Sequence, residues 1–294
     1  MPPIEINADC VFDELPFLRR VDHPKSLKTP TAPTFLDAPK FAKILHKFDT
    51  FIFDCDGVLW LGSDRIEGSP AFIDLLLANG KQVLCMTNNA TVSRATYGKK
   101  LAKLGYNLGA KDLVNPSAVI ADLLHRKGLH KSGKRVFVIG EQGVRDELDE
   151  LGVPHFGHDL NDAQKPTTNA FLLNLDLEEK AENVGANLIV PDAGPILAAC
   201  SSASGREPLI VGKPNTPAFD YICRRWSIDP KRTLMVGDRT DTDIKFGREH
   251  GLSTLLVLSG CHQMEDVVEN QMSGQNDKVP HFYATNLGSL VPSN

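Results

Sequence analysis

The sequence lacks the features of membrane-bound, secreted and nucleic-acid-binding proteins. No apolar run among its 294 residues approaches the length that spans a membrane, and the opening MPPIEINADC lacks the basic and then apolar order of a signal peptide. The six cysteines are scattered and form no CxxC pair, which favours reduced thiols and a cytoplasmic location. The formal net charge of −5 gives no reason to expect a nucleic acid or a membrane as a partner.

The overall composition is typical of a globular protein. Hydrophobic residues make up 41% of the chain and charged residues 23%, and the length allows a large core in one or two domains. Residues 1–40 differ from the rest, because they hold seven prolines and show neither a helical nor a strand period. We expect these residues to form an extended N-terminal arm that wraps the surface or is partly disordered.

Beyond residue 40, short apolar segments alternate with helical patterns. We expect strands at 51–55, 82–86, 135–139, 209–211, 233–236 and 253–258, and helices at 70–79, 93–104, 117–127, 144–151, 196–202, 217–226 and 244–250. This alternation predicts an α/β fold with a doubly wound parallel sheet. The rhythm weakens within 130–207, where the weaker signals are a strand at 170–175, a helix at 178–183 and an apolar run at 188–190. We interpret 130–207 as an insertion into a core formed by 41–129 and 208–294.

Polar side chains follow four of the expected strands. They are Asp54 and Asp56, then Thr87, Asn88 and Asn89, then Lys213, and finally Asp238 and Asp243. If these strands are neighbours, the side chains meet at the edge of the sheet where open α/β proteins bind ligands. Carboxylates suit Mg²⁺, and a lysine with small hydrogen-bond donors suits phosphate oxygens. The combination fits the transfer of a phosphoryl group.

Each motif taken alone has a plainer interpretation. The run Asp54–Gly57 could belong to a calcium loop, but Val58 and Arg65 stand where that loop needs oxygen ligands. By default, Asp238–Asp243 is a solvated turn, Thr87–Asn89 a helix-capping turn, Lys213 a surface lysine and Gly260 an ordinary turn glycine. Cys55 and Trp60 are by default packing residues, although Trp60 could also line a pocket. The functional interpretation therefore depends on the set of motifs and on their order.

As a set, the motifs resemble those of the haloacid dehalogenase (HAD) superfamily in its phosphatase branch. The pattern DxDGV, a Ser or Thr after the second strand, a lysine and GDxxxxD corresponds to Asp54–Val58, Thr87, Lys213 and Gly237–Asp243. The finer motifs DCDGVLW, TNNAT, VGKP and MVGDR resemble the group of p-nitrophenyl, phosphoglycolate and pyridoxal phosphatases, which carry a type IIA cap domain. The resemblance covers residues 48 to about 291, apart from part of the middle.

The resemblance implies how the acids would act. Asp54 would be the nucleophile that forms an aspartyl-phosphate, and Asp56 would act as general acid and then as general base. The metal ion, Mg²⁺, would be held by the carboxylates of Asp54 and Asp238 and by the main-chain carbonyl of Asp56. Asp243 would orient the metal shell. A dehalogenase is disfavoured, because that branch generally lacks the second acid.

The same resemblance implies the substrate contacts. Thr87 and Asn88 would hydrogen-bond the phosphoryl oxygens of the substrate, and Asn89 would also bind the substrate. Lys213 would neutralise charge between Asp54 and the phosphate. The substrate would be a small phosphorylated metabolite.

The chain departs from the family in its middle. Family members carry a segment like VGYDxxFxYxKL…LVATNxD. Here that segment is missing: Gly185 is followed almost directly by residues that resemble the part of the family sequence downstream of the segment. We therefore interpret 130–207 as a shortened cap domain. We expect a Mg²⁺-dependent phosphatase of small phosphomonoesters, in which a cap-mediated homodimer would be weakened. Two alternatives stay open: a regulatory protein that binds metal and phosphate but turns over poorly, and a phosphotransferase or mutase.

Overall fold

The computed structural model describes residues 32–157 and 193–292. Most of the expected N-terminal arm and the segments 170–175, 178–183 and 188–190 lie outside these residues. In the part of the chain that is described, no helix is long and apolar enough to cross a membrane.

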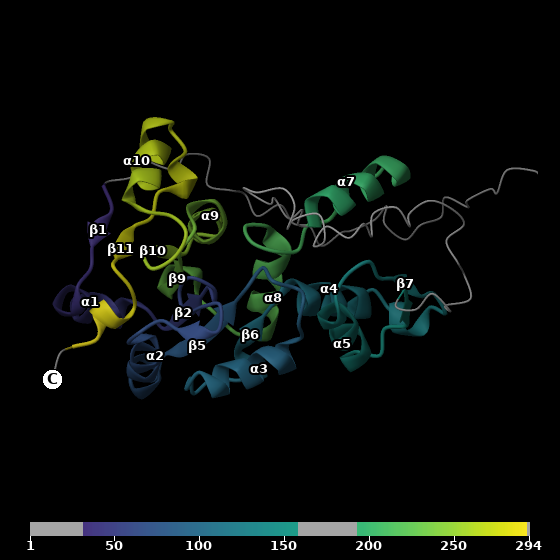
Figure 1. Ribbon diagram of the computed structural model, residues 1–294, viewed down its shortest axis with the longest axis horizontal. Coiled ribbons are helices and arrows are strands. Elements are labelled where there is room, and N and C mark those ends of the chain that lie inside the picture. The colour runs from purple at the N-terminus through teal and green to yellow at the C-terminus, as the bar shows by residue number, and fades with distance from the viewer. Residues whose placement is uncertain (1–31, 158–192, 293–294) are drawn as a thin grey trace, which may run out of the picture.

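A seven-stranded parallel sheet forms the centre of the molecule, in the order β1-β11-β10-β9-β2-β5-β6 (Figure 1). The strands are β1 Thr34–Phe35, β2 Thr50–Phe53, β5 Gln82–Met86, β6 Leu113–Val114, β9 Thr233–Gly237, β10 Ser253–Val257 and β11 Phe282–Ala284. From β2 the chain adds β5 and β6 on one side, and it then adds β9, β10 and β11 on the other side of β2. The expected doubly wound α/β fold is therefore confirmed.

Helices cover both faces of this sheet. They are α1 Ala38–Ile44, α2 Ser69–Ala78, α3 Arg94–Lys103, α4 Pro116–Arg126, α8 Thr216–Arg225, α9 Lys245–Glu249 and α10 Met264–Met272. Alternate side chains of β2 enter different cores: Phe51 and Phe53 pack with Phe72 of α2, whereas Ile52 packs with Ile222 of α8. This burial on both faces explains why the central strands are almost continuously apolar.

The structure corrects the expectation for the end of the N-terminal arm. Residues 34–40 are not an extended arm, because Thr34–Phe35 pairs in parallel with β11 and α1 begins at Ala38. Asp37 caps α1 by accepting a hydrogen bond from the Lys40 N–H at 2.9 Å. Pro39 lies in the first turn, where a helix needs no N–H donor. Pro39 is therefore compatible with the start of a helix here and does not prevent one.

The expected strand at 209–211 is also wrong. Residues 209–211 pair with no strand in the described part of the chain, and Leu209 and Ile210 are 48% and 49% exposed. A short apolar run alone does not distinguish a strand from a loop. Conversely, β6, β11 and α10 are not among the elements expected from the sequence.

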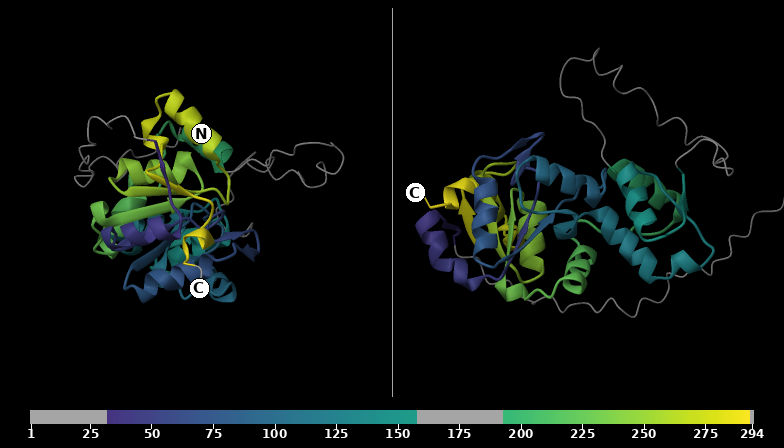
Figure 2. Two further views of the ribbon diagram at one scale, coloured as in Figure 1. Left: turned by 90° about the vertical axis from the view of Figure 1, so that its left-hand side faces the viewer. Right: turned by 90° about the horizontal axis from the view of Figure 1, so that it is seen from below.

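A smaller unit lies beyond α4, at the end of the molecule opposite α1 (Figures 1 and 2). Its strands β7 Val136–Phe137 and β8 His155–Phe156 form a separate two-stranded sheet, with α5 Gln142–Glu150 between them in the chain. The helix α7, Ala193–Ser204, follows the undescribed segment. Because these elements share no strand with the central sheet, the interpretation of 130–207 as an inserted domain stays a prediction that the topology supports.

Candidate active site

Three strands that lie side by side present their C-terminal ends at one place. Asp54 follows β2, Thr87 follows β5 and Asp238 follows β9, and β2 lies between the other two strands. The strand order reverses between β2 and β9, which is the position where open α/β sheets form ligand clefts. The turn after β2 requires Gly57, whose φ is +85°.

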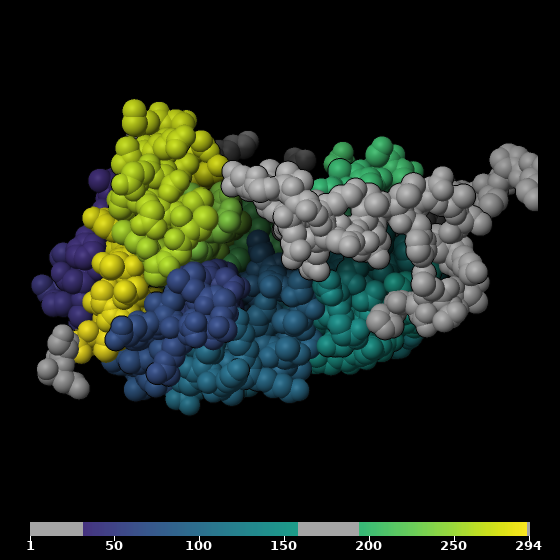
Figure 3. All heavy atoms as spheres, in the orientation of Figure 1, coloured from purple at the N-terminus to yellow at the C-terminus, as the bar shows by residue number. Residues whose placement is uncertain are grey.

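A pocket of about 740 Å³ opens at this edge of the sheet. Of the eight residues predicted for the site, seven line it: Asp54, Asp56, Thr87, Asn88, Asn89, Lys213 and Asp238. Asp243 lies behind the pocket, with its Oδ1 2.7 Å from the Lys213 Nζ. Loops after β2 and β10 adjoin on this side, since the Ser259 Oγ donates to the Gly57 carbonyl at 2.7 Å; Figure 3 shows the corresponding blue and yellow-green segments next to each other.

Lys213 is a buried cation between two carboxylates. Its Nζ lies 2.5 Å from the Asp54 Oδ1 and donates to the Met86 carbonyl at 2.9 Å. Burial alone would lower the pKa of the Lys213 ammonium, but Asp243 and Asp54 outweigh it and raise that pKa. Burial raises the pKa of Asp54 to about 7; repulsion from Asp243 adds to the shift and attraction to Lys213 opposes it. Lys213 therefore stays protonated, and its ammonium group contacts the Asp54 carboxylate that is predicted to attack phosphorus.

Asn88 holds the Lys213 backbone in place. The Asn88 Nδ2 donates to the Lys213 carbonyl at 2.9 Å, and the Lys213 N–H donates to the Asn88 Oδ1 at 2.8 Å. This pair of hydrogen bonds positions Lys213 although no strand precedes it. The Asn88 amide is thus engaged with the protein, and its assignment to the phosphoryl group stays a prediction.

Asp54, Asp238 and Asp243 form the acidic cluster of the site. One carboxylate oxygen from each lies within 4.8 Å of the others. The Asp238 Oδ1 is buried and has no hydrogen-bond partner among the described residues, while its Oδ2 accepts from the Cys261 N–H at 2.8 Å. Burial also raises the pKa of Asp238. An unpartnered oxygen among crowded carboxylates is the arrangement that a hard divalent cation satisfies, so these residues fit a metal ion.

Gly260 was expected to be an ordinary turn glycine, but it shapes the acidic cluster. A Cβ added at Gly260 would collide with the Asp238 carboxylate, as would one at Gly57. The two glycines therefore let backbone approach the oxygens of Asp238. The sequence held a usable signal, because Ser259, Gly260 and Cys261 also follow a parallel strand, β10, that ends at the same edge.

Asp56 lies apart from the acidic cluster. Its carboxylate is exposed at the pocket, and its Oδ1 accepts a hydrogen bond from the Trp60 Nε1 at 2.7 Å. Within residues 32–157 and 193–292 it is not one of the clustered metal-ligating side chains. Trp60, expected by default to be a packing residue, packs in the core and also contacts Asp56 at the pocket.

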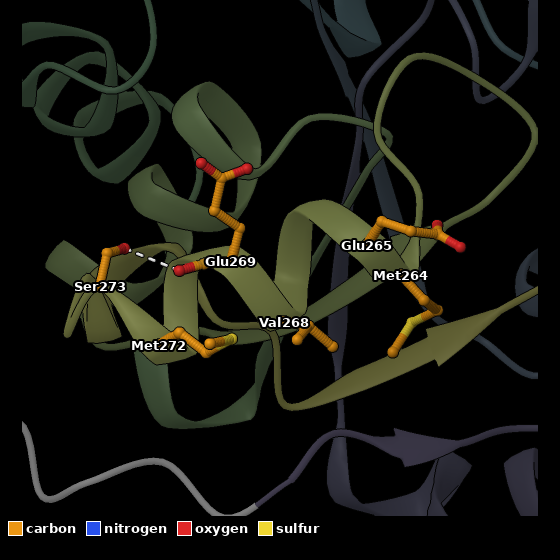
Figure 4. A pocket seen from close by; sticks show the side chains of 6 residues that line it. All are labelled: Met264, Glu265, Val268, Glu269, Met272 and Ser273. Carbon is orange, nitrogen blue, oxygen red and sulfur yellow. Dashed lines mark hydrogen bonds between the residues drawn. The ribbon is translucent and has the colours of Figure 1, made fainter.

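A second hollow, of about 600 Å³, has a different character. It runs along the outer face of α10 and is bordered by Met264, Val268 and Met272, with Glu265 and Glu269 beside them (Figure 4). No cation and no cluster of hydrogen-bond donors borders it within the described chain. Converging charged groups thus mark the pocket at the strand ends as the candidate active site.

Comparison with known proteins identifies relatives for most of the chain. A family model described as haloacid dehalogenase-like hydrolase matches residues 51–154, and a second model for HAD-like hydrolases matches residues 210–290. The chain is 33% identical to the chloroplastic phosphoglycolate phosphatase 1A of Arabidopsis thaliana, over 93% of this chain and 86% of the relative.

Two solved structures have similar folds. The 4-nitrophenylphosphatase of Thermotoga maritima aligns with a TM-score of 0.65 and 28% identity, over 84% of this chain and 97% of that one. The glycerol phosphate phosphatase of Mycobacterium tuberculosis, in complex with magnesium, aligns with a TM-score of 0.64 and 25% identity, over 87% of this chain and 79% of that one.

Proposed function

Since the chain belongs to the haloacid dehalogenase-like hydrolases and is a phosphatase of that family, we propose that it hydrolyses small phosphomonoesters, with Asp54 as nucleophile and Mg²⁺ as cofactor. One observation carries the proposal. The buried Lys213 Nζ contacts the Asp54 carboxylate, and Asp238, whose Oδ1 has no hydrogen-bond partner among the described residues, belongs to the same acidic cluster. A nucleophilic carboxylate, a fixed cation and a candidate metal site therefore adjoin in one pocket.

The residues of the chain would act in two steps. In the first, a bond forms between an Asp54 oxygen and phosphorus, the bond from phosphorus to the ester oxygen breaks, and Asp56 gives its proton to that oxygen. In the second, water loses a proton to Asp56 and its oxygen bonds to phosphorus, while the bond to Asp54 breaks and inorganic phosphate leaves. Thr87, Asn88 and Asn89 would hold the phosphoryl group.

Asp54, Asp238 and the main-chain carbonyl of Asp56 would hold Mg²⁺, and Asp243 would support the site. When bound, Mg²⁺ offsets the repulsion between the attacking carboxylate and the phosphate dianion. Lys213 contributes to the same end from the protein side. At about 4 Å and an effective dielectric of about 20, one such charge contact amounts to roughly 4 kcal/mol.

The relatives suggest the substrate class. Their names refer to phosphoglycolate, glycerol phosphate and nitrophenyl phosphate, and a pocket of about 740 Å³ is large enough for esters of this size. We also propose a cytoplasmic location, for which the scattered cysteines are the support.

The alternative is a weakly active regulatory protein with a reduced cap domain. The alignment with the Arabidopsis phosphatase runs over 318 residues, which is more than the 294 residues of this chain, so the relative carries residues that are missing here. Residues 155–209 lie between the two family-model matches. A reduced cap would weaken substrate selection and any cap-mediated homodimer, and leave the core chemistry in place.

A phosphate-release screen tests the proposal. Phosphorylated metabolites and p-nitrophenyl phosphate are offered with and without Mg²⁺, beside the variant Asp54→Asn. We expect Mg²⁺-dependent release that the variant loses. Binding of Mg²⁺ and phosphate without release would support the regulatory alternative, and full release by Asp54→Asn would contradict the proposal.

A further inference from the structure

We propose that Trp60 is a positioning residue for Asp56: its indole N–H holds one carboxylate oxygen, so that the other oxygen carries the proton that is transferred. This inference rests on the proposed function, because it concerns the step in which Asp56 protonates the leaving group. It assigns to Trp60 a role beyond packing.

The hydrogen bond joins a rigid donor to an exposed acceptor. Trp60 is fully buried, whereas Asp56 is exposed at the pocket, and the distance from the Trp60 Nε1 to the Asp56 Oδ1 is 2.7 Å. An exposed aspartate on a turn ordinarily has several accessible rotamers. The indole N–H removes that freedom, because it is a donor only and its direction is fixed by the ring.

Aromatic and cationic neighbours fix the ring of Trp60. Tyr97 of α3 stacks on it with centroids 6.2 Å apart at 20°, and Tyr106 meets it edge-on at 6.5 Å. The Lys100 Nζ lies 4.2 Å from the ring centroid and also donates to the Gly62 carbonyl at 3.0 Å. The Trp60 carbonyl accepts from the Gly57 N–H at 2.8 Å, which closes the turn that carries Asp56. The donor is therefore held by the core, by α3 and by the turn itself.

The donor decides which oxygen of Asp56 can carry a proton. A proton on the Asp56 Oδ1 would face the indole hydrogen, so the acid form carries its proton on Oδ2. As the Asp54 oxygen bonds to phosphorus and the ester bond breaks, Oδ2 gives this proton to the leaving oxygen. In the second step the same oxygen takes a proton from water. Without the indole N–H, the Asp56 carboxyl would lose its fixed geometry.

The variant Trp60→Phe keeps an aromatic ring and removes the N–H. Trp226→Phe is a matched control, because Trp226 is the second of only two tryptophans and packs against Tyr221 at the end of α8. The readout is kcat/KM, which reports the steps up to release of the leaving group. Glycerol phosphate has a poor leaving group that needs a proton, whereas nitrophenolate leaves without one.

We expect Trp60→Phe to lower kcat/KM for glycerol phosphate roughly 10- to 100-fold, the value of one hydrogen bond to a charged group. For p-nitrophenyl phosphate the loss should stay below about threefold, and Trp226→Phe should change neither value. In an Asp56→Asn background, Trp60→Phe should add less than about a twofold loss. Equal losses with both substrates, or an undiminished loss in the Asp56→Asn background, would overturn the inference.

A second measurement uses the protein with Trp60 intact. In the Trp226→Phe chain the only indole N–H signal in an NMR spectrum is that of Trp60, and Asp56→Asn should move it, whereas an unchanged signal would contradict the contact. If the unaltered protein releases phosphate from none of the esters in the phosphate-release screen, the proposed function fails and the inference falls with it. If the protein is active but Trp60→Phe behaves as Trp226→Phe does, the inference alone fails.

Discussion

At the scale of single residues, the site depends on side chains that hold other side chains. Asn88 binds both the N–H and the carbonyl of Lys213, and the Lys213 Nζ in turn contacts Asp54 and Asp243. Lys213 lies in a loop, so these contacts replace the support that a strand would give. The position of Lys213, the cation proposed to act in catalysis, therefore depends on the side-chain amide of Asn88.

Asn88→Ala should loosen Lys213 without removing its charge. The loss of two hydrogen bonds of about 1 kcal/mol each corresponds to a decrease in kcat/KM of roughly 10- to 100-fold. Steady-state kinetics with p-nitrophenyl phosphate measures it. An unchanged kcat/KM would show that the loop holds Lys213 by other means.

Gly260→Ala should disturb the metal site by crowding. Its Cβ would collide with the Asp238 carboxylate, so we expect the Mg²⁺ concentration for half-maximal activity to rise about tenfold or more, a cost of roughly 1.4 kcal/mol. Gly109→Ala is the matched control, since no described atom lies within 4 Å of the added Cβ. A Mg²⁺ titration that gives the same midpoint for both variants would contradict the assignment of Asp238.

At the scale of elements, one buried ion pair joins α3 to α5. The Arg94 Nη2 lies 2.7 Å from the Glu147 Oε2 and 3.1 Å from the Glu150 Oε2, but the side chain of Glu147 is 1% exposed and that of Glu150 is 60% exposed. The Arg94 N–H also donates to the Glu147 Oε1 at 2.7 Å. Glu147 therefore anchors the smaller unit to the N-terminal end of α3.

Glu147 and Glu150 pair with the same arginine but differ in exposure, so their variants compare a buried ion pair with an exposed one. Glu147→Gln should lower the free energy of unfolding by about 3 kcal/mol, because it removes the buried counter-charge of Arg94 and leaves only the exposed carboxylate of Glu150. Glu150→Gln should cost less than about 1 kcal/mol, because water screens the exposed pair. Urea denaturation measures both, and equal losses would mean that burial does not decide the strength of these pairs.

Elements also show what the sequence could and could not predict. The strand at 82–86 and the strands that end before Asp54 and Asp238 were predictable, because each is an apolar run followed by a polar turn. The two-residue strand β6 carries too short a pattern to be recognised, and 209–211 carried the pattern without forming a strand. Partners distant in sequence decide such short segments. The hydrogen bond from Trp60 to Asp56 depends on tertiary packing against α3, so only coordinates could show it.

At the scale of the whole molecule, folding brings three carboxylates close together, and a bound cation would reduce the repulsion between them. Asp54, Asp238 and Asp243 are crowded and buried, so Mg²⁺ should bind the folded chain and not the unfolded one. At a Mg²⁺ concentration about 100 times its Kd, the gain in stability should be about 2.7 kcal/mol. We expect a rise in Tm on adding Mg²⁺ that Asp238→Asn abolishes, measured by calorimetry. An equal rise in the variant would place the ion elsewhere.

The most direct measurement is to trap the phosphorylated protein. The chain is mixed with Mg²⁺ and p-nitrophenyl phosphate, quenched in acid within its first turnovers, and digested for mass spectrometry. We predict one phosphoryl group on the peptide that contains Asp54, with none in the Asp54→Asn variant. Release of phosphate with no phosphoryl group on Asp54, or with one on another residue, would contradict the central claim.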